Sequence, residues 1–454
     1  MRPLLLLAIL GVLTSSPPAA AADALQARID RAPPGSEIVV AGVAAGPVVI
    51  RKPLRIVGAP GAVIDGGGRG TIVRIEAPDV VLSRLTLRRS GRDLNTEDAG
   101  IFVGAPGVVL EDLALEEVLF GVNLKQAHGA VIRRVAVRGY DLPLSRRGDG
   151  IRLWYSHGVT LSELRLERVR DLLLWFARGT TLYAADIRRS RYGVHLMYAD
   201  AARLLDGHFE DNAVGAYIMY STGVRVEGNR FLRHRGSTGV GLALKESDDV
   251  LIRSNLLAGN HVGLYIDGTP RLLTARSEII DNVIAGNEIG LQVLGSAGGN
   301  VVAGNVLDGN VLQVRIDGGR SGAHRWSRGG RGNYWSDYAG LDLRGDGVGD
   351  TPYRARQWFE ALGDRIPELA WLRGSIAAAA VDFAARALPI FAPEVLLEDP
   401  SPLMRPDVPR AFRGAGASLP FALVSLALTA AGLAAMGAAR SSFRGSTASR
   451  RSAA

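Results

Sequence analysis

Soft metal ligands recur at a fixed spacing in the middle of the chain. Met197 and Met219 hold the same position in two similar segments, Gly193-Val-His-Leu-Met and Gly215-Ala-Tyr-Ile-Met, and His195 precedes Met197 by two residues. Thioether and imidazole groups suit Cu(I), and the chain has no cysteine to serve instead. His195, Met197 and Met219 are therefore candidate copper ligands. Exposed methionines are also adaptable contact surface, so partner docking is the alternative interpretation.

A second group of possible metal ligands is acidic. Asp342, Asp346 and Asp350 are spaced four apart among glycines. Ca²⁺ prefers oxygen ligands on a tightly bent loop, so this spacing resembles a calcium-binding turn. It lacks the alternate-residue spacing and the closing glutamate of an EF-hand loop. A purely structural Asp/Gly turn is the competing interpretation.

The elements that must position these residues form a tandem repeat of about 22 residues. Each unit holds short runs with period-2 apolar alternation, which are separated by turns rich in Gly, Asn and Asp. No helix-length amphipathic segment lies between units. The pattern predicts an all-β fold, a right-handed parallel β-helix over residues 23–320, and the asparagines at the turns could stack along its axis. The repeat units begin at Gly100, Gly121, Gly150, Gly193, Gly215, Gly241, Gly263 and Gly290, and Leu172–Phe176 fits the same frame without its glycine.

The alternation also predicts which side chains leave the core of this repeat. In the unit at Gly193, Val194 and Leu196 would point inward. A contiguous apolar patch on an outer face usually marks a binding site, although a covering loop or C-terminal segment could make it ordinary secondary core. We predict a partner-docking face. The same register places on it Trp154, Leu174, Phe176, His195, Met197, Tyr217 and Met219.

Many β-helix proteins cleave or modify polysaccharides, so a polysaccharide-binding or polysaccharide-cleaving protein (a lyase, hydrolase or epimerase) is the alternative function. Such enzymes need clustered acids and bases on one outer face. The available groups are spread over several coils, and the outer face is apolar where a cleft for acidic sugars would be charged. We therefore predict a noncatalytic protein. The available groups are Asp149, Lys245, Asp248, Asp249 and Asp267.

The ends of the chain predict export. Residues 1–22 have a charged start, an apolar run too short to span a bilayer, and small residues suited to signal-peptidase cleavage. Residues 419–439 are uncharged and long enough for one membrane crossing, and residues 440–454 are basic, as a cytoplasmic tail would be. The alternative for 419–439 is a helix packed on the surface. The expected location is the periplasm, with an anchor in the cytoplasmic membrane.

Between the repeat and this anchor, residues 321–353 form an aromatic, Gly- and Asp-rich closing segment. Residues 354–410 read as helices followed by a proline-rich docking tail. A helix over Ala24–Ala32 would cap the open N-terminal end of the solenoid. The histidines outside the docking face, among them His234, fall mostly in turns and are expected to be solvated.

The formal net charge of +8 comes almost wholly from arginine. These arginines are scattered along the chain and form no clustered basic stripe, so nucleic acid is not an expected partner. A solvated basic surface explains the charge.

Several strings together resemble the NosD family of periplasmic accessory proteins for nitrous oxide reductase maturation. The resemblance covers residues 23–406, and the segment past Ser418 departs from the family pattern. It implies an ABC transporter permease and ATPase, a copper-chaperone lipoprotein and nitrous oxide reductase as partners in assembling a copper-sulfide centre. We therefore expect coils from Arg152 to Met219 to dock a copper-carrying partner or the reductase, and Gln357–Pro406 to engage the permease. The strings are Gly193-Val-His-Leu-Met-Tyr198, Gly215-Ala-Tyr-Ile-Met-Tyr-Ser221, Leu244-Lys-Glu-Ser-Asp-Asp-Val250, Gly263-Leu-Tyr-Ile-Asp-Gly-Thr-Pro270, Asn333-Tyr-Trp-Ser-Asp337, Asp342 to Tyr353 and Asp399-Pro-Ser-Pro-Leu-Met-Arg-Pro406.

Overall fold

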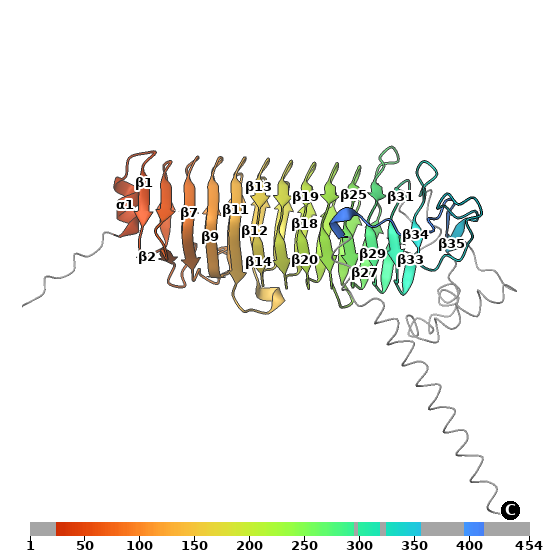
Figure 1. The fold of residues 1–454 in the computed structure, drawn as a ribbon. Coiled ribbons are helices and arrows are strands. Elements are labelled where there is room, and N and C mark those ends of the chain that lie inside the picture. The colour runs from red at the N-terminus through yellow and green to blue at the C-terminus, as the bar shows by residue number, and fades with distance from the viewer. Residues whose placement is uncertain (1–23, 295–297, 318–323, 356–394, 413–454) are drawn as a thin grey trace, which may run out of the picture.

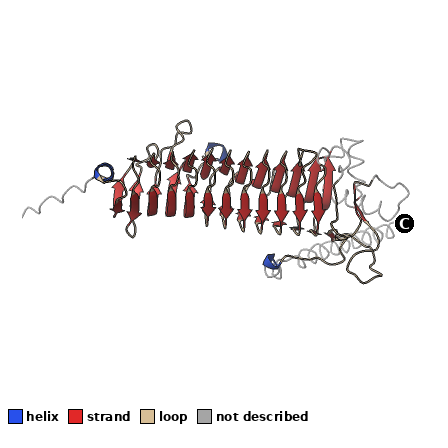
Figure 2. Ribbon diagram, turned by 90° about the horizontal axis from the view of Figure 1, so that it is seen from above, coloured by secondary structure: helices blue, strands red, loops and turns tan. Residues whose placement is uncertain are grey.

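The computed structural model of the protein describes residues 24–294, 298–317, 324–355 and 395–412. These residues form a right-handed parallel β-solenoid of about 12 turns with almost no helix, which Figure 1 shows as one elongated stack of coils. The predicted all-β parallel β-helix is confirmed. Each regular coil contributes one strand to each of three parallel ladders, and Figure 2 shows the strands stacked in rows along the solenoid axis.

One ladder is a continuous 12-stranded sheet, and the candidate ligands lie on it. Its strands run in chain order along the axis, each paired in parallel with the corresponding strand of the next coil. They are β3 (Val48–Ile50), β6 (Val73–Ile75), β8 (Ala99–Val103), β10 (Phe120–Lys125), β12 (Ile151–Trp154), β15 (Asp171–Trp175), β18 (Tyr192–Met197), β21 (Val214–Met219), β24 (Val240–Lys245), β27 (Val262–Asp267), β30 (Ile289–Leu294) and β33 (Leu312–Asp317).

The other two ladders join into one sheet, because three long strands extend across both. These strands are β7 (Val81–Arg88), β9 (Val109–Val118) and β11 (Val131–Gly139). The second ladder also contains β1 (Glu37–Val40), β4 (Arg55–Gly58), β13 (Thr160–Ser162), β16 (Thr181–Tyr183), β19 (Arg203–Leu205), β22 (Arg225–Glu227), β25 (Leu251–Arg253), β28 (Glu278–Ile280) and β31 (Val301–Ala303). The third also contains β2 (Val43–Ala45), β5 (Val63–Asp65), β14 (Arg165–Glu167), β17 (Asp186–Arg188), β20 (His208–Glu210), β23 (Arg230–Leu232), β26 (Leu256–Ala258), β29 (Val283–Ala285), β32 (Val306–Asp308) and β34 (Tyr334–Trp335).

The inward side chains of all three ladders form one apolar core of stacked Val, Ile and Leu. The repeated glycine at the start of each unit has a steric cause. A Cβ added at Gly193 would lie 2.4 Å from the carbonyl oxygen of Gly215, and one at Gly215 would lie 2.3 Å from that of Gly241. The coils therefore approach too closely at this position for any side chain.

The N-terminal end of the solenoid is closed by α1 (Leu25–Arg31), which confirms the predicted capping helix. Leu25 and Ile29 are buried against the first coils. Gln26 accepts a hydrogen bond from the Val49 backbone N–H and donates one to its carbonyl, so the helix occupies the exposed edge of β3. A strand edge left unpaired there would invite association with other chains.

Buried asparagines stack along the coils, as the turn pattern predicted. In one ladder Asn255 donates to the side chain of Asn282, and Asn282 donates in turn to Asn305, with donor–acceptor distances of 3.0 and 2.9 Å. A parallel ladder contains His234 between Asn212 and Asn260. The expectation that His234 is solvated is wrong, because this turn position points into the solenoid and the His234 side chain is fully buried.

The C-terminal segment 397–412, which we call the strap, begins with β36 (Leu397–Asp399). That strand pairs in antiparallel fashion with β35 (Tyr353–Ala355). Buried Asp399 accepts hydrogen bonds from the Asn333 backbone and the Trp335 indole at 2.7 and 3.0 Å. The strap ends in a 3-10 turn at Phe412, which packs on the outer face of the third ladder among Leu256, Ala258, Val283, Ala285 and Val306.

Within the described part of the chain, no helix has the length and apolar character needed to cross a bilayer. Residues 1–22, 419–439 and 440–454, for which a signal peptide, a membrane span and a cytoplasmic tail are predicted, lie outside the described residues. So do the helices expected between residues 357 and 388.

Candidate functional site

Five of the predicted outward residues and one unpredicted residue lie on the outer surface of the 12-stranded sheet. Parallel pairing places Trp154 beside Trp175, Trp175 beside Met197, and Met197 beside Met219. All four are half-buried side chains on the outward face. His195 lies two residues before Met197 on the same strand, and it pairs with Tyr217 of the next coil. The structure therefore brings the candidate copper ligands together.

The prediction for β15 is wrong by one residue. Leu174 pairs with Leu153 and Leu196 and is fully buried in the core, while Leu173 and Trp175 take the outward positions. This coil lacks the repeated glycine, and its register shifts between Asp171 and Leu173. Because side chains alternate with a period of two, a slip of one residue exchanges the inner and outer faces.

Phe176 belongs to a second outward column, one residue beyond the first. It sits in a turn with positive φ, together with Tyr155, Tyr198 and Tyr220 of the adjoining coils. The rings stack in series, with centroid distances of 4.6 Å for Tyr155–Phe176, 4.9 Å for Phe176–Tyr198 and 5.2 Å for Tyr198–Tyr220. The sequence prediction missed these tyrosines, although an aromatic residue directly follows the outward column in four successive coils.

The two columns together form what we call the aromatic patch. It consists of four coils of apolar side chains with a polar border at each end, since Lys125 pairs with Trp154 and Lys245 with Met219. An apolar centre with a polar rim is the usual anatomy of a protein interface. The patch comprises Trp154, Tyr155, Trp175, Phe176, Met197, Tyr198, Met219 and Tyr220.

His195, Met197 and Met219 form a soft-ligand cluster within this face. The Nε2 atom of His195 lies 3.4 Å from the Sδ atom of Met219, and Met197 is the register partner of Met219. On a tetrahedral zinc ion, an imidazole nitrogen at about 2.0 Å and a thiolate sulfur at about 2.3 Å are roughly 3.5 Å apart, which sets the scale for one ion shared by a nitrogen and a sulfur. The observed separation is close to that value, so little rearrangement would be needed for both atoms to bind one ion.

Asp171 lies behind the histidine, on the side of its Nδ1 atom. The carboxylate is buried and receives the Arg191 guanidinium, with Nε at 2.9 Å from Oδ1. Burial opposes ionisation, but interactions with His195 and Arg191 outweigh it and lower the pKa of Asp171. His195 Nδ1 lies 3.7 Å from Oδ2 of this carboxylate, and it is buried without a hydrogen-bond partner. An anion on the Nδ1 side favours the tautomer with Nδ1–H, which leaves the Nε2 lone pair toward Met219.

Two tyrosine rings lie against the His195 side of the cluster. Tyr192 contacts the His195 ring edge-on at 4.9 Å between centroids, and Tyr217 lies at 6.3 Å. Burial raises the pKa of Tyr217 to about 12, so its hydroxyl stays protonated at any physiological pH. The cluster therefore has uncharged aromatic rings beside its soft ligands.

No part of the strap lies on this sheet among the residues that the structure describes, since Phe412 packs on the third ladder instead. Coverage by the strap therefore does not account for the apolar residues of the patch.

The acidic loop is held by hydrogen bonds between its own residues. Asp342 accepts hydrogen bonds from the backbone of Gly345, Asp346 and Gly347, and Asp350 accepts from Leu343 and from Arg344. The described residues contain no group of three His, Cys, Asp or Glu side chains arranged to hold a metal ion. These bonds favour the structural interpretation of the loop over the calcium interpretation.

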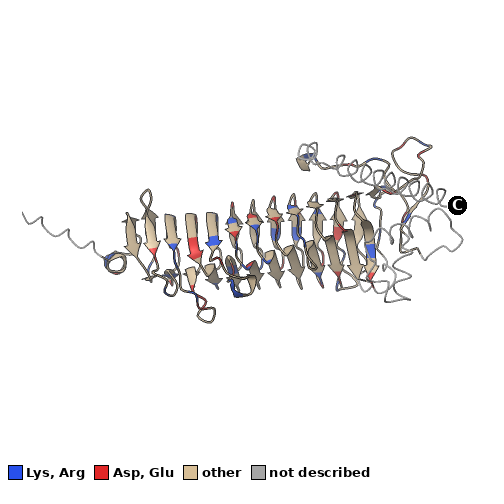
Figure 3. Ribbon diagram, turned by 90° about the horizontal axis from the view of Figure 1, so that it is seen from below, with Lys and Arg blue, Asp and Glu red and all other residues tan. Residues whose placement is uncertain are grey.

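The acids and bases considered for sugar chemistry are engaged in separate interactions. Asp149 pairs with Arg170 at 2.8 and 3.0 Å, and Lys245 pairs with Asp267 at 3.4 Å. Asp248 accepts hydrogen bonds from the Arg271 and Leu272 backbone. Figure 3 shows basic and acidic residues interspersed along the coils.

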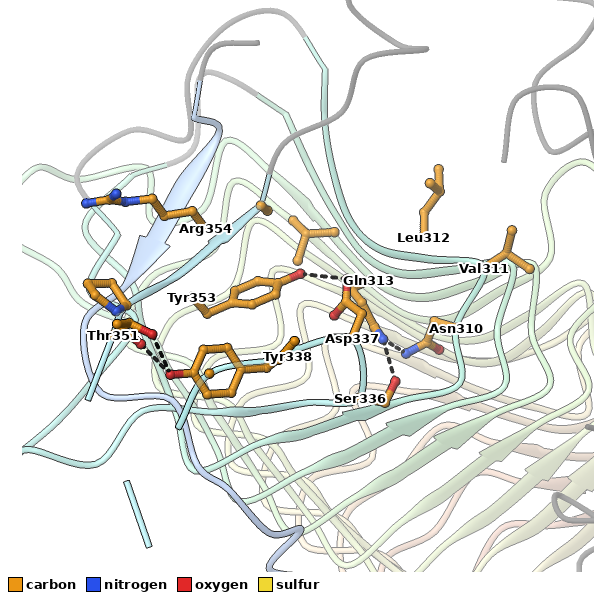
Figure 4. Close-up of a pocket in the computed structure, with 15 residues that line it drawn as sticks. Asn310, Val311, Leu312, Gln313, Ser336, Asp337, Tyr338, Thr351, Tyr353 and Arg354 are labelled. Carbon is orange, nitrogen blue, oxygen red and sulfur yellow. Dashed lines mark hydrogen bonds between the residues drawn. The ribbon is translucent and has the colours of Figure 1, made fainter. Parts of the chain in front are cut away.

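The C-terminal end of the solenoid has a cavity of about 480 Å³ between the last coil and the segment around Tyr338 and Tyr353 (Figure 4). The Tyr338 hydroxyl donates to the Thr351 carbonyl, and Tyr353 stacks on buried Trp335 at 4.3 Å. Tyr353 also donates from its hydroxyl to Asp337 at 3.3 Å. These interactions close the end of the stack, and none of the described residues that line the cavity is a soft ligand.

Comparison with known proteins gives a consistent family signal. The family model described as "Periplasmic copper-binding protein (NosD)" matches residues 130–340. A protein of Pseudomonas aeruginosa strain PAO1 named "Probable ABC transporter binding protein NosD" is 31% identical over 445 residues, covering 89% of this chain and 95% of that protein. A protein of the same name from Stutzerimonas stutzeri is 27% identical, covering 80% of this chain and 86% of that protein.

Among solved structures, the A-module of a mannuronan C-5 epimerase from Azotobacter vinelandii superposes with a TM-score of 0.54. The identity is 16%, and the match covers 66% of this chain and 93% of that module. At this identity the likeness shows a shared fold only.

Proposed function

This chain belongs to the NosD family, and on that premise we propose that it is a noncatalytic periplasmic accessory protein that handles Cu(I). In this proposal it works with the permease and ATPase of an ABC transporter, receives copper from a copper-chaperone lipoprotein, and serves the assembly of the copper-sulfide centre of nitrous oxide reductase. Copper is the cargo in this role, and it binds transiently.

The observation that carries the proposal is the contact between His195 Nε2 and Met219 Sδ at 3.4 Å, with Met197 alongside. Thioether ligands select Cu(I) over harder ions, and imidazole also binds copper. The residues lie on strands of a rigid sheet, which holds ligands more firmly than loops do. A transient site needs few ligands and an open side from which the ion can leave.

The aromatic patch supports the docking part of the proposal. A partner that binds over these four coils would lie directly on the soft-ligand cluster, so docking and ion transfer would share one face. Aromatic residues and methionine are enriched at protein interfaces. The tail between Gln357 and Pro406, most of which lies outside the described residues, is the proposed contact with the permease.

The same patch argues against sugar binding. A sugar stacks on the free face of an aromatic ring, but the rings of Tyr155, Phe176 and Tyr198 are nearly parallel and cover one another's faces, with interplanar angles of 16° and 5°. Mainly ring edges are left for a ligand. Together with the paired state of Asp149 and Lys245, this favours a binding protein over a polysaccharide enzyme.

The test replaces sulfur while keeping apolar volume. We expect the double variant Met197→Leu and Met219→Leu to remain folded and to lower copper loading of nitrous oxide reductase in a denitrifying host by at least about tenfold, because two of the three soft ligands are removed. Leu205→Met, at a half-buried position on the second ladder, is the matched control and should load the enzyme normally. Unchanged loading with the double variant, or with the stronger pair Met197→Ala and Met219→Ala, would contradict the proposal.

A further inference from the structure

A tryptophan borders the soft-ligand cluster on one side. Trp175 is the register partner of Met197, one coil before it. On the other side Lys245 is the partner of Met219, and its ammonium is held by Asp267 at 3.4 Å. An ion between His195 and the two sulfurs would therefore have an indole ring as its neighbour along the outward column.

The contacts of the Trp175 indole indicate a role other than packing. The Nε1–H of Trp175 is buried and has no hydrogen-bond partner, although buried tryptophan N–H groups usually find one. Ring contacts fix its orientation instead. The Trp154 ring meets it edge-on at 4.4 Å and 81°, and the Phe176 ring is nearly parallel at 6.2 Å and 14°. A buried unsatisfied group calls for an explanation.

The charge around the cluster indicates what such a ring could do. The Asp171 carboxylate faces the opposite nitrogen of the histidine and is already paired with Arg191. The nitrogen and both sulfurs are neutral, so a bound ion would keep its positive charge. The π face of tryptophan attracts a cation within about 6 Å, and most strongly where water is excluded.

We propose that Trp175 caps a monovalent soft-cation site, with its π face covering a Cu(I) or Ag(I) ion held by His195, Met197 and Met219. This deepens the proposed function and rests on it. The ion's charge is met by the ring quadrupole rather than by a carboxylate. A divalent ion such as Zn²⁺ would find too few hard or borderline ligands here, so the site selects for charge as well as softness.

The cap can be tested by titrating the full chain with Ag(I) while following tryptophan fluorescence, and by measuring affinity in competition with a chelator of known strength. Wild type should bind one ion with marked quenching. Trp175→Leu should lose most of that quenching and bind about 2- to 30-fold more weakly, the range that a cation–π contact spans. Trp175→Phe, which keeps a weaker π face, should bind with intermediate affinity. Tyr183→Leu, at an exposed position on the second ladder, is the control and should retain quenching and affinity.

The outcomes separate the two proposals. If Ag(I) binds through His195 and Met219 but Trp175→Leu leaves both quenching and affinity unchanged, the cap is overturned while the copper role stands. Zn²⁺ binding as tight as that of Ag(I) would overturn the charge selection. If wild type takes up neither Ag(I) nor Cu(I), this proposal and direct copper binding in the proposed function both fail.

Discussion

His234 is the residue whose burial contrasts most with its sequence context. It replaces asparagine in an internal ladder, accepting from the Asn212 backbone through Nδ1 while its Nε2 is buried without a partner. An asparagine side chain offers both an acceptor and two donors at such a position, whereas a neutral imidazole offers one of each. Burial lowers the pKa of His234 to about 4, so the ring is neutral in the native protein.

This burial makes stability depend on pH. Below the ordinary histidine pKa of about 6.5, His234 binds a proton in the unfolded chain, whereas the buried ring stays neutral in the folded chain. The free energy of unfolding therefore falls as the pH drops toward about 4. The loss is on the order of 3 kcal/mol at its fullest. We expect His234→Asn to remove this loss, so that its melting temperature rises relative to wild type between pH 7 and pH 4.5. Melting curves that shift in parallel for the two proteins would show that His234 plays no part.

At the scale of elements, the coils could be predicted because period-2 alternation and a repeated glycine report directly on a stacked sheet. The soft-ligand cluster followed from the same register. The prediction failed for β15, because this coil has no glycine to mark the start of the repeat. A register shift after Asp171 changes which of its side chains face outward. The His195–Met219 and Asp171–His195 contacts each join residues some twenty positions apart. No pattern in the local sequence predicts such contacts.

The acidic loop is a further element whose role can be measured. Asp342 receives three backbone N–H groups, so the turn is held without an ion. We expect neither EDTA nor millimolar Ca²⁺ to move the melting temperature by more than about 1 °C, whereas Asp342→Ala should lower it because three amide donors lose their acceptor. A rise of several degrees with Ca²⁺ would instead establish a calcium site at Asp342, Asp346 and Asp350.

At the scale of the whole molecule, the solenoid presents different surfaces on its different faces. The aromatic patch lies on the 12-stranded sheet, and the apolar strip of the third ladder is covered by the strap through Phe412 and its neighbours. The core is continuous from α1 to the last coil, so the two surfaces are held in a fixed relation.

A charge placed in the aromatic patch should weaken partner binding without unfolding the chain. Tyr198 is 41% exposed at the centre of the patch, so Tyr198→Glu should be tolerated structurally and should reduce co-purification of the copper-carrying partner from membranes by about tenfold or more. Tyr183, 46% exposed on the second ladder, offers a matched control as Tyr183→Glu. Equal recovery of the partner with both variants would place the docking surface elsewhere.

The regular rise of the coils has one more consequence. From β18 to β33 the sheet advances by five strand pairings, each of about 4.8 Å, so β18, which carries His195 and Met197, stands roughly 24 Å from the last strand of this sheet. In such a molecule, the distance of a site from the end of the sheet changes only in steps of one coil. Inserting or removing one whole coil between the site and the end of the sheet would move the site by about 4.8 Å along the axis without altering its residues. The reach from a membrane-bound machine to a partner could thus be set in discrete steps, by counting repeats rather than by redesigning a surface.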